Sequence, residues 1–139
     1  MGILDKIRGK KPIEEEKTAK KALSELELLC SDDPEVYEAL KEVMFLDPRK
    51  IEYSLEEALK KAKEAEKSKD TINAYFWYRV AGGLAIYEGD VEKVKQCFGK
   101  LAKISPNLHL KILEIPEKAV KKAKEYYEKY LKPEEEAIS

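Results

Sequence analysis

Residues 74–90 read AYFWYRVAGGLAIYEGD and form the most apolar stretch of a chain in which 40% of the residues are charged. The stretch contains the only tryptophan and two adjacent glycines, Gly82 and Gly83. A glycine inside a helix costs about 1 kcal/mol relative to alanine, so close packing of a neighbour must compensate. A helix that is apolar nearly all round must also be covered on more than one side. We therefore predict a buried helix whose glycines admit large side chains such as Trp77 or Phe98.

The rest of the chain continues this helical pattern on both sides. Apolar residues recur at spacings of three and four, without the alternation typical of strands. Asp33 followed by Pro34 predicts a helix start, Ser54 with Glu57 predicts a capping box, and Gly89 predicts the end of the central helix. We expect an all-α fold, a compact antiparallel bundle of about six or seven helices. The expected helices cover residues 12–30, 34–46, 55–65, 71–89, 91–104, 108–115 and 116–131.

The length of 139 residues indicates a single domain. We expect this helical domain to cover residues 12–132. Residues 1–11 are expected to be a basic amphipathic leader, and residues 133–139 an acidic, frayed tail.

Composition restricts the classes of partner and the compartment. The 27 basic and 28 acidic residues leave a net charge of -1, so no bulk attraction to nucleic acid or anionic lipid is implied. Heavy use of lysine and glutamate with few amides is typical of heat-adapted proteins. Cys30 and Cys97 both lie among apolar residues, which predicts buried thiols in a reducing, cytoplasmic setting. No apolar run approaches the roughly 20 residues that a membrane-spanning helix needs.

Part of the chain matches a helical-repeat pattern. Tetratricopeptide repeats follow W-x2-L-G-x2-Y, then A-x3-F, then P, and their glycine lets two helices pack closely. Residues 75–108 resemble one such repeat, with identities at Gly82, Phe98 and Pro106. Residues 23–48 resemble a weaker copy of the same repeat. This copy is separated from residues 75–108 by more residues than in a regular repeat array, which indicates a compact bundle with TPR-like hairpins. The remaining positions of the pattern hold Tyr78, Ala81, Ala85 and Val94.

The resemblance implies a surface and a function. In tetratricopeptide proteins the first helix of each hairpin lines a concave groove that receives peptides or partner helices. By this resemblance the partner-binding positions are Phe76, Arg79, Gly83, Ile86 and Tyr87, with Arg79 and Tyr87 reaching the groove's edge. The implied function is a non-enzymatic protein-protein interaction module, a small adaptor or scaffold. Tetratricopeptide proteins that bind a peptide carboxylate have asparagine at the position of Gly83, so the resemblance does not imply recognition of a peptide carboxyl terminus.

Residues that carry chemistry are sparse. His109 is the only histidine and lies between two leucines, so neither a metal site nor a histidine base is expected. Gly82 and Gly83 lie inside a helix, not in a phosphate-binding loop. Glutamates stand four residues before lysines at Glu56, Glu57, Glu117 and Glu125, which predicts ion pairs along solvated helix faces. We expect no catalytic residues, no cofactor and no enzymatic activity.

Three other interpretations remain open on the sequence. Ile3, Leu4 and Ile7 sit among basic residues, so the leader is a flexible segment, docks on the first helix, or makes a weak contact with a membrane surface as in a peripheral membrane adaptor. A basic stripe consists of Lys93, Lys95, Lys100 and Lys103. This stripe suits a helical subunit of a larger enzyme or nucleic-acid complex, but no aromatic residues lie between the lysines, so we favour an exposed solubilising face. A homo-oligomer is also compatible with an apolar groove.

Overall fold

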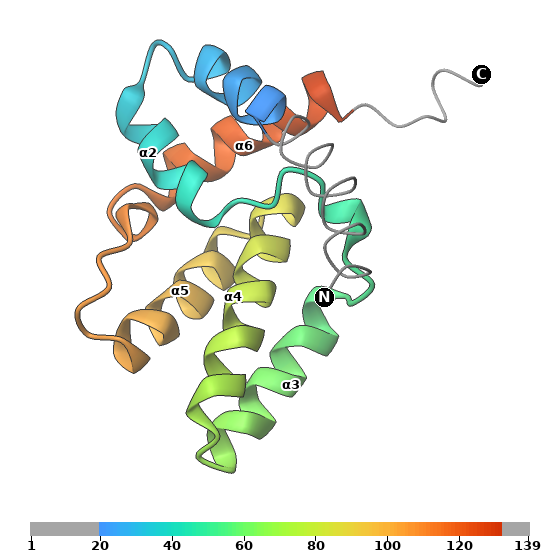
Figure 1. Cartoon of the computed structure of the whole chain (residues 1–139), viewed down its shortest axis with the longest axis vertical. Coiled ribbons are helices and arrows are strands. Elements are labelled where there is room, and N and C mark those ends of the chain that lie inside the picture. The colour runs from blue at the N-terminus through green and yellow to red at the C-terminus, as the bar shows by residue number, and fades with distance from the viewer. Residues whose placement is uncertain (1–19, 132–139) are drawn as a thin grey trace, which may run out of the picture.

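The computed structural model describes residues 20–131, which form helices joined by turns and linkers, with no strand among them (Figure 1). The predicted all-α bundle is confirmed. The leader, the start of the first helix and the tail lie outside the described residues. A helical segment over residues 20–29 comes first. It is followed by α2 (Pro34–Val43), the 3-10 turn η1 (Pro48–Lys50), α3 (Leu55–Lys67), α4 (Thr71–Glu88), α5 (Val91–Ile104), the 3-10 turn η2 (Lys111–Leu113) and α6 (Pro116–Tyr130).

Local hydrogen bonds fix the helix starts where the sequence predicts them. At α3 the backbone N–H of Glu57 donates to Ser54 Oγ at 3.1 Å, and the N–H of Ser54 donates to Glu57 Oε1 at 3.0 Å. These two bonds are the reciprocal pair of a capping box. Asp33 and Asp70 cap α2 and α4 through their side chains in the same general way. The capping predictions are therefore confirmed.

Two boundaries differ from the prediction. Helix α2 ends at Val43, because Met44 has extended backbone angles, and residues 44–47 form a linker into η1. In the region 108–115, predicted to be a short helix, only the 3-10 turn of η2 forms. The linker after α2 carries Phe45, whose position determines much of the surface described below.

Helix α4 is the centre of the bundle. It packs against α3 on one side and α5 on the other, and the three helices lie side by side (Figure 1). Helices α2 and α6 contact the same central helix. Coverage by so many elements explains why the helix needs apolar residues on nearly every face. Its buried residues are Ala74, Tyr78, Val80, Ala81, Gly82, Gly83, Leu84, Ala85 and Ile86.

Each of the two glycines admits a different aromatic ring. A Cβ atom placed on Gly82 would lie 2.5 Å from Cζ of Phe98, which is fully buried in α5. A Cβ atom on Gly83 would collide with the ring of Phe45. The expected insertion of Phe98 is thus found, whereas Trp77 is half-buried and stacks edge-to-face on Tyr53. The glycines are required by close approach, not by helix geometry.

Candidate functional site

The structure separates the five residues predicted to line one groove. Phe76 and Tyr87 are exposed, with 52% and 43% of their surface accessible. Gly83 is buried beneath Phe45, and Ile86 is only 1% exposed. Arg79 is half-buried. The five residues therefore do not form one open surface. Gly83 and Ile86, which the resemblance placed in an accessible groove, are buried.

The linker after α2 occupies the surface where the resemblance places a ligand. The ring of Phe45 covers Gly83, and the guanidinium carbon of Arg79 lies 4.9 Å from the centre of that ring. The backbone carbonyl of Phe45 accepts a hydrogen bond from the hydroxyl of Tyr127 in α6. Tyr127 in turn stacks edge-to-face on Tyr87, with ring centres 5.0 Å apart. The chain's own residues therefore cover the part of α4 around Gly83, while Tyr87 remains exposed.

Arg79 was expected to reach the edge of the groove, but it does not lie at an open edge. Its Nη1 atom is buried and has no hydrogen-bond acceptor among the described residues. Burial lowers the pKa of Arg79 from its ordinary value, because a charged group is less stable away from water. The face of the Phe45 ring offsets part of this cost through a cation–π contact.

The N-terminal half of α4, in contrast, presents an open apolar surface. Ile72 and Phe76 stand four residues apart, hence on one helix face, and Ile72 is 83% exposed. The ring of Trp77 lies edge-to-face with both Phe76 and Tyr53, at centre distances of 5.0 and 4.8 Å. We call Tyr53, Ile72, Phe76 and Trp77 the α4 patch. Of these four residues, the sequence interpretation placed only Phe76 at the site.

One cation stands at the rim of the α4 patch. The ammonium group of Lys61 lies 5.3 Å from the ring centre of Trp77 and 5.8 Å from that of Tyr53. Cation–π attraction holds the ammonium group over these rings. The patch therefore combines exposed aromatic and aliphatic surface with a positive charge at one edge.

The predicted basic stripe of α5 is partly neutralised. Lys100 donates to Glu66 of α3 at 2.8 Å, and Lys95 lies 3.4 Å from Glu117 of α6. Lys93 instead lines a groove between α3 and α5. The stripe is thus not a continuous row of unpaired charge.

The groups considered for chemistry are dispersed. Within residues 20–131, no three or more His, Cys, Asp or Glu side chains are grouped so as to hold a metal ion. His109 is exposed, and its Nε2 lies 2.7 Å from Glu114 Oε2. Cys30 and Cys97 are buried and form no disulfide. Burial raises the pKa of Cys30 to about 11 and that of Cys97 to about 12, so both thiols stay protonated near neutral pH.

The fold defines the chain as an all-α helical bundle. Comparison with protein-family models, with curated proteins and with solved structures finds no match. None of the described helices combines the length and apolar character required to cross a bilayer.

Proposed function

We propose that the protein is a non-enzymatic interaction module that binds an amphipathic segment of a partner protein through the α4 patch. The observation that carries the proposal is the exposure of Ile72 and Phe76, 83% and 52%, on one face of a rigidly packed helix. Contiguous exposed apolar surface on an otherwise highly charged protein is typical of contact sites. Trp77 and Tyr53 add the aromatic anchors that are enriched in interfaces.

The chemistry of the surface favours a particular partner. The face built on Ile72 and Phe76 suits the apolar stripe of a helix or short peptide, with anchors about one helical turn apart. Lys61 at the rim favours an acidic residue beside that stripe. We therefore propose a partner segment with an apolar face flanked by acidic side chains.

The TPR-like hairpin is part of the same proposal. The close packing of α4 on α5 through Gly82 and Phe98 supports it. Because Phe45 covers the part of α4 around Gly83, the proposed site moves to the N-terminal half. Of the five residues predicted from the resemblance, Phe76 is the one retained in the proposed contact.

The test compares patch variants with a matched surface variant. Phe76→Ala and Ile72→Glu remove the apolar contact, while Leu28→Glu changes an equally prominent side chain, 67% exposed, outside the patch. Proteins captured from cell lysate by the wild type identify a candidate, which is then purified and titrated calorimetrically against all four proteins. We expect each patch variant to raise the Kd at least about tenfold and Leu28→Glu to leave it unchanged.

Two outcomes would overturn the proposal. One is a purified partner whose affinity is the same for the wild type and for both patch variants, with circular dichroism showing equal helicity. The other is a wild type that dimerises by light scattering while Ile72→Glu is monomeric, because the α4 patch would then be filled by a second copy.

A further inference from the structure

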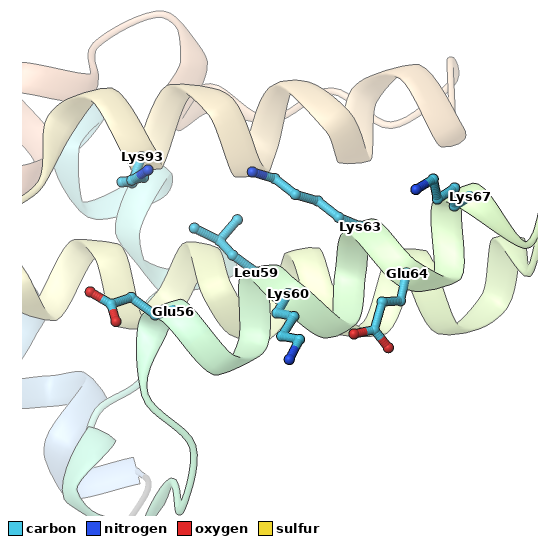
Figure 2. A pocket seen from close by; sticks show the side chains of 7 residues that line it. All are labelled: Glu56, Leu59, Lys60, Lys63, Glu64, Lys67 and Lys93. Atoms are coloured by element: carbon cyan, nitrogen blue, oxygen red, sulfur yellow. The ribbon is translucent and has the colours of Figure 1, made fainter.

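A second surface lies between α3 and α5. Both helices pack on α4 but not on each other, and the groove between them has a volume of about 520 Å³. Leu59 and Lys63 point from α3 toward α5, and Lys93 points from α5 into the same space (Figure 2). The full lining consists of Glu56, Leu59, Lys60, Lys63, Glu64, Lys67 and Lys93.

The lysines of this groove are not neutralised. Within residues 20–131, Lys60, Lys63, Lys67 and Lys93 lie in no ion pair, and the expected pair of Glu56 with Lys60 does not form. In this same part of the chain some lysines elsewhere on the bundle pair with carboxylates, namely Lys95, Lys100, Lys111, Lys118 and Lys122, whereas others, such as Lys121 and Lys124, do not. The lining holds these four lysines against two glutamates, Glu56 and Glu64, so its net positive charge creates a local field that attracts anions.

The adjoining part of the structure shows how a carboxylate fits between these helices. The carboxylate of Glu66, on α3, accepts a hydrogen bond from Tyr78 of α4 at 2.7 Å and another from Lys100 of α5 at 2.8 Å. Hydrogen bonding by Lys100 and Tyr78 lowers the pKa of Glu66, because both donors stabilise the ionised form. The space between α3 and α5 thus already accommodates one carboxylate from within the chain.

We propose that the groove between α3 and α5 binds an extended acidic segment of a protein partner, whose carboxylates pair with Lys63, Lys67 and Lys93. Lys63 and Lys67 are four residues apart, about 6 Å along the helix axis. Alternate residues of an extended chain are about 6.6 Å apart, so two acidic side chains at alternate positions match this spacing.

Nucleic acid fits the same surface less well. Glu56 and Glu64 line the groove beside the lysines and would repel a closely spaced phosphate backbone. No aromatic side chain lines the groove to stack on a base. A peptide with separated carboxylates avoids the two glutamates.

The test is fluorescence anisotropy with a labelled synthetic peptide that carries two glutamates at alternate positions. The paired variant Lys63→Gln with Lys93→Gln is compared with Lys121→Gln with Lys124→Gln, which removes the same charge from exposed positions of α6. We expect the groove variant to weaken binding at least about tenfold and the α6 variant to change it little. A peptide with glutamine in place of glutamate should not bind, and salt should weaken binding of the acidic peptide.

Three results would overturn this inference. The first is that the groove variant and the α6 variant bind the acidic peptide equally well. The second is that the wild type does not bind the peptide at low ionic strength. The third is that labelled single-stranded DNA binds more tightly than the peptide and loses this binding in the groove variant. The Phe76→Ala variant should bind the acidic peptide like the wild type. Failure of the groove is therefore distinguishable from failure of the α4 patch.

Discussion

Replacing Gly82 by alanine tests the packing that holds α4 against α5. The new Cβ atom would lie 2.5 Å from Cζ of Phe98 and 2.8 Å from both Cε atoms. Phe98 is fully buried, and because protein cores are closely packed, its ring can move only by displacing neighbouring core side chains. Overpacking of this kind costs about 1–3 kcal/mol. The better helix propensity of alanine recovers about 1 kcal/mol. We therefore expect Gly82→Ala to lower the free energy of unfolding by about 1 kcal/mol, and by as much as about 2.

Gly99 provides the matched control within α5. A Cβ atom at Gly99 would meet no other atom within 4 Å. Gly99→Ala should therefore raise the free energy of unfolding by up to about 1 kcal/mol, through propensity and a less flexible unfolded chain. Urea unfolding followed by circular dichroism gives both values. The two substitutions are chemically identical, so their difference measures the contact with Phe98.

A double-mutant cycle identifies the ring as the cause. Phe98→Leu removes the ring atoms that would meet the new Cβ atom, at the cost of a smaller core side chain. In that background Gly82→Ala should stabilise the protein instead of destabilising it. The reasoning is refuted if Gly82→Ala stabilises the wild type as much as Gly99→Ala does, or if Phe98→Leu leaves the sign of its effect unchanged.

Three further predictions concern a helix cap, the reactivity of the buried thiols and the pH dependence of stability. Ser54→Ala removes the acceptor of the Glu57 N–H and should lower the free energy of unfolding by about 1 kcal/mol in a urea titration; an unchanged value would contradict the stabilising role of the capping box. Cys30 and Cys97, with pKa values raised to about 11 and about 12, should resist a disulfide reagent until urea unfolds the chain, and rapid modification of the folded protein would contradict their burial. Because the unfolded chain releases these thiol protons near the ordinary pKa of 9.0, stability should fall as the pH rises above that value, and less so after Cys30→Ala with Cys97→Ala.

The features that the sequence predicts well depend on residues close together in the chain. The Ser54–Glu57 box, the aspartate caps and the turn at Gly89, where φ is 75°, each involve a few neighbouring positions. Helical periodicity likewise shows which side of each helix is apolar. Such signals are independent of how the helices pack, so the element boundaries could be predicted with few errors.

Contacts between distant residues could not be predicted in the same way. Phe45 falls within the predicted helix 34–46 but lies in a linker in the structure, and nothing in its neighbourhood indicates that it covers Gly83 and Arg79. Its insertion buries Gly83, so the five predicted positions do not form one open surface. The available signal for the α4 patch was the spacing of Ile72 and Phe76, two hydrophobic residues four positions apart.

The predicted ion pairs show the same limit. Glu117 is predicted to pair with Lys121 on its own helix, yet in the structure it lies 3.4 Å from Lys95 of α5. Among the residues that the structure describes, Glu57 forms no ion pair with Lys61 and accepts the backbone N–H of Ser54, as the capping box predicts. A long side chain reaches partners on a neighbouring helix as easily as partners on its own helix. Tertiary packing therefore decides which pairs form.

The division of α4 into a buried and an exposed half affects the entropy of recognition. The buried half, anchored by the rings of Phe98 and Phe45, fixes the backbone of the exposed half, because both belong to one continuous helix. Ile72 and Phe76 are thus presented on backbone that is already ordered before any partner arrives. Ordering an interface on binding reduces affinity, so a preorganised helix avoids that loss. The close packing at Gly82 and Gly83 therefore preorganises the proposed binding site, although it touches neither Ile72 nor Phe76.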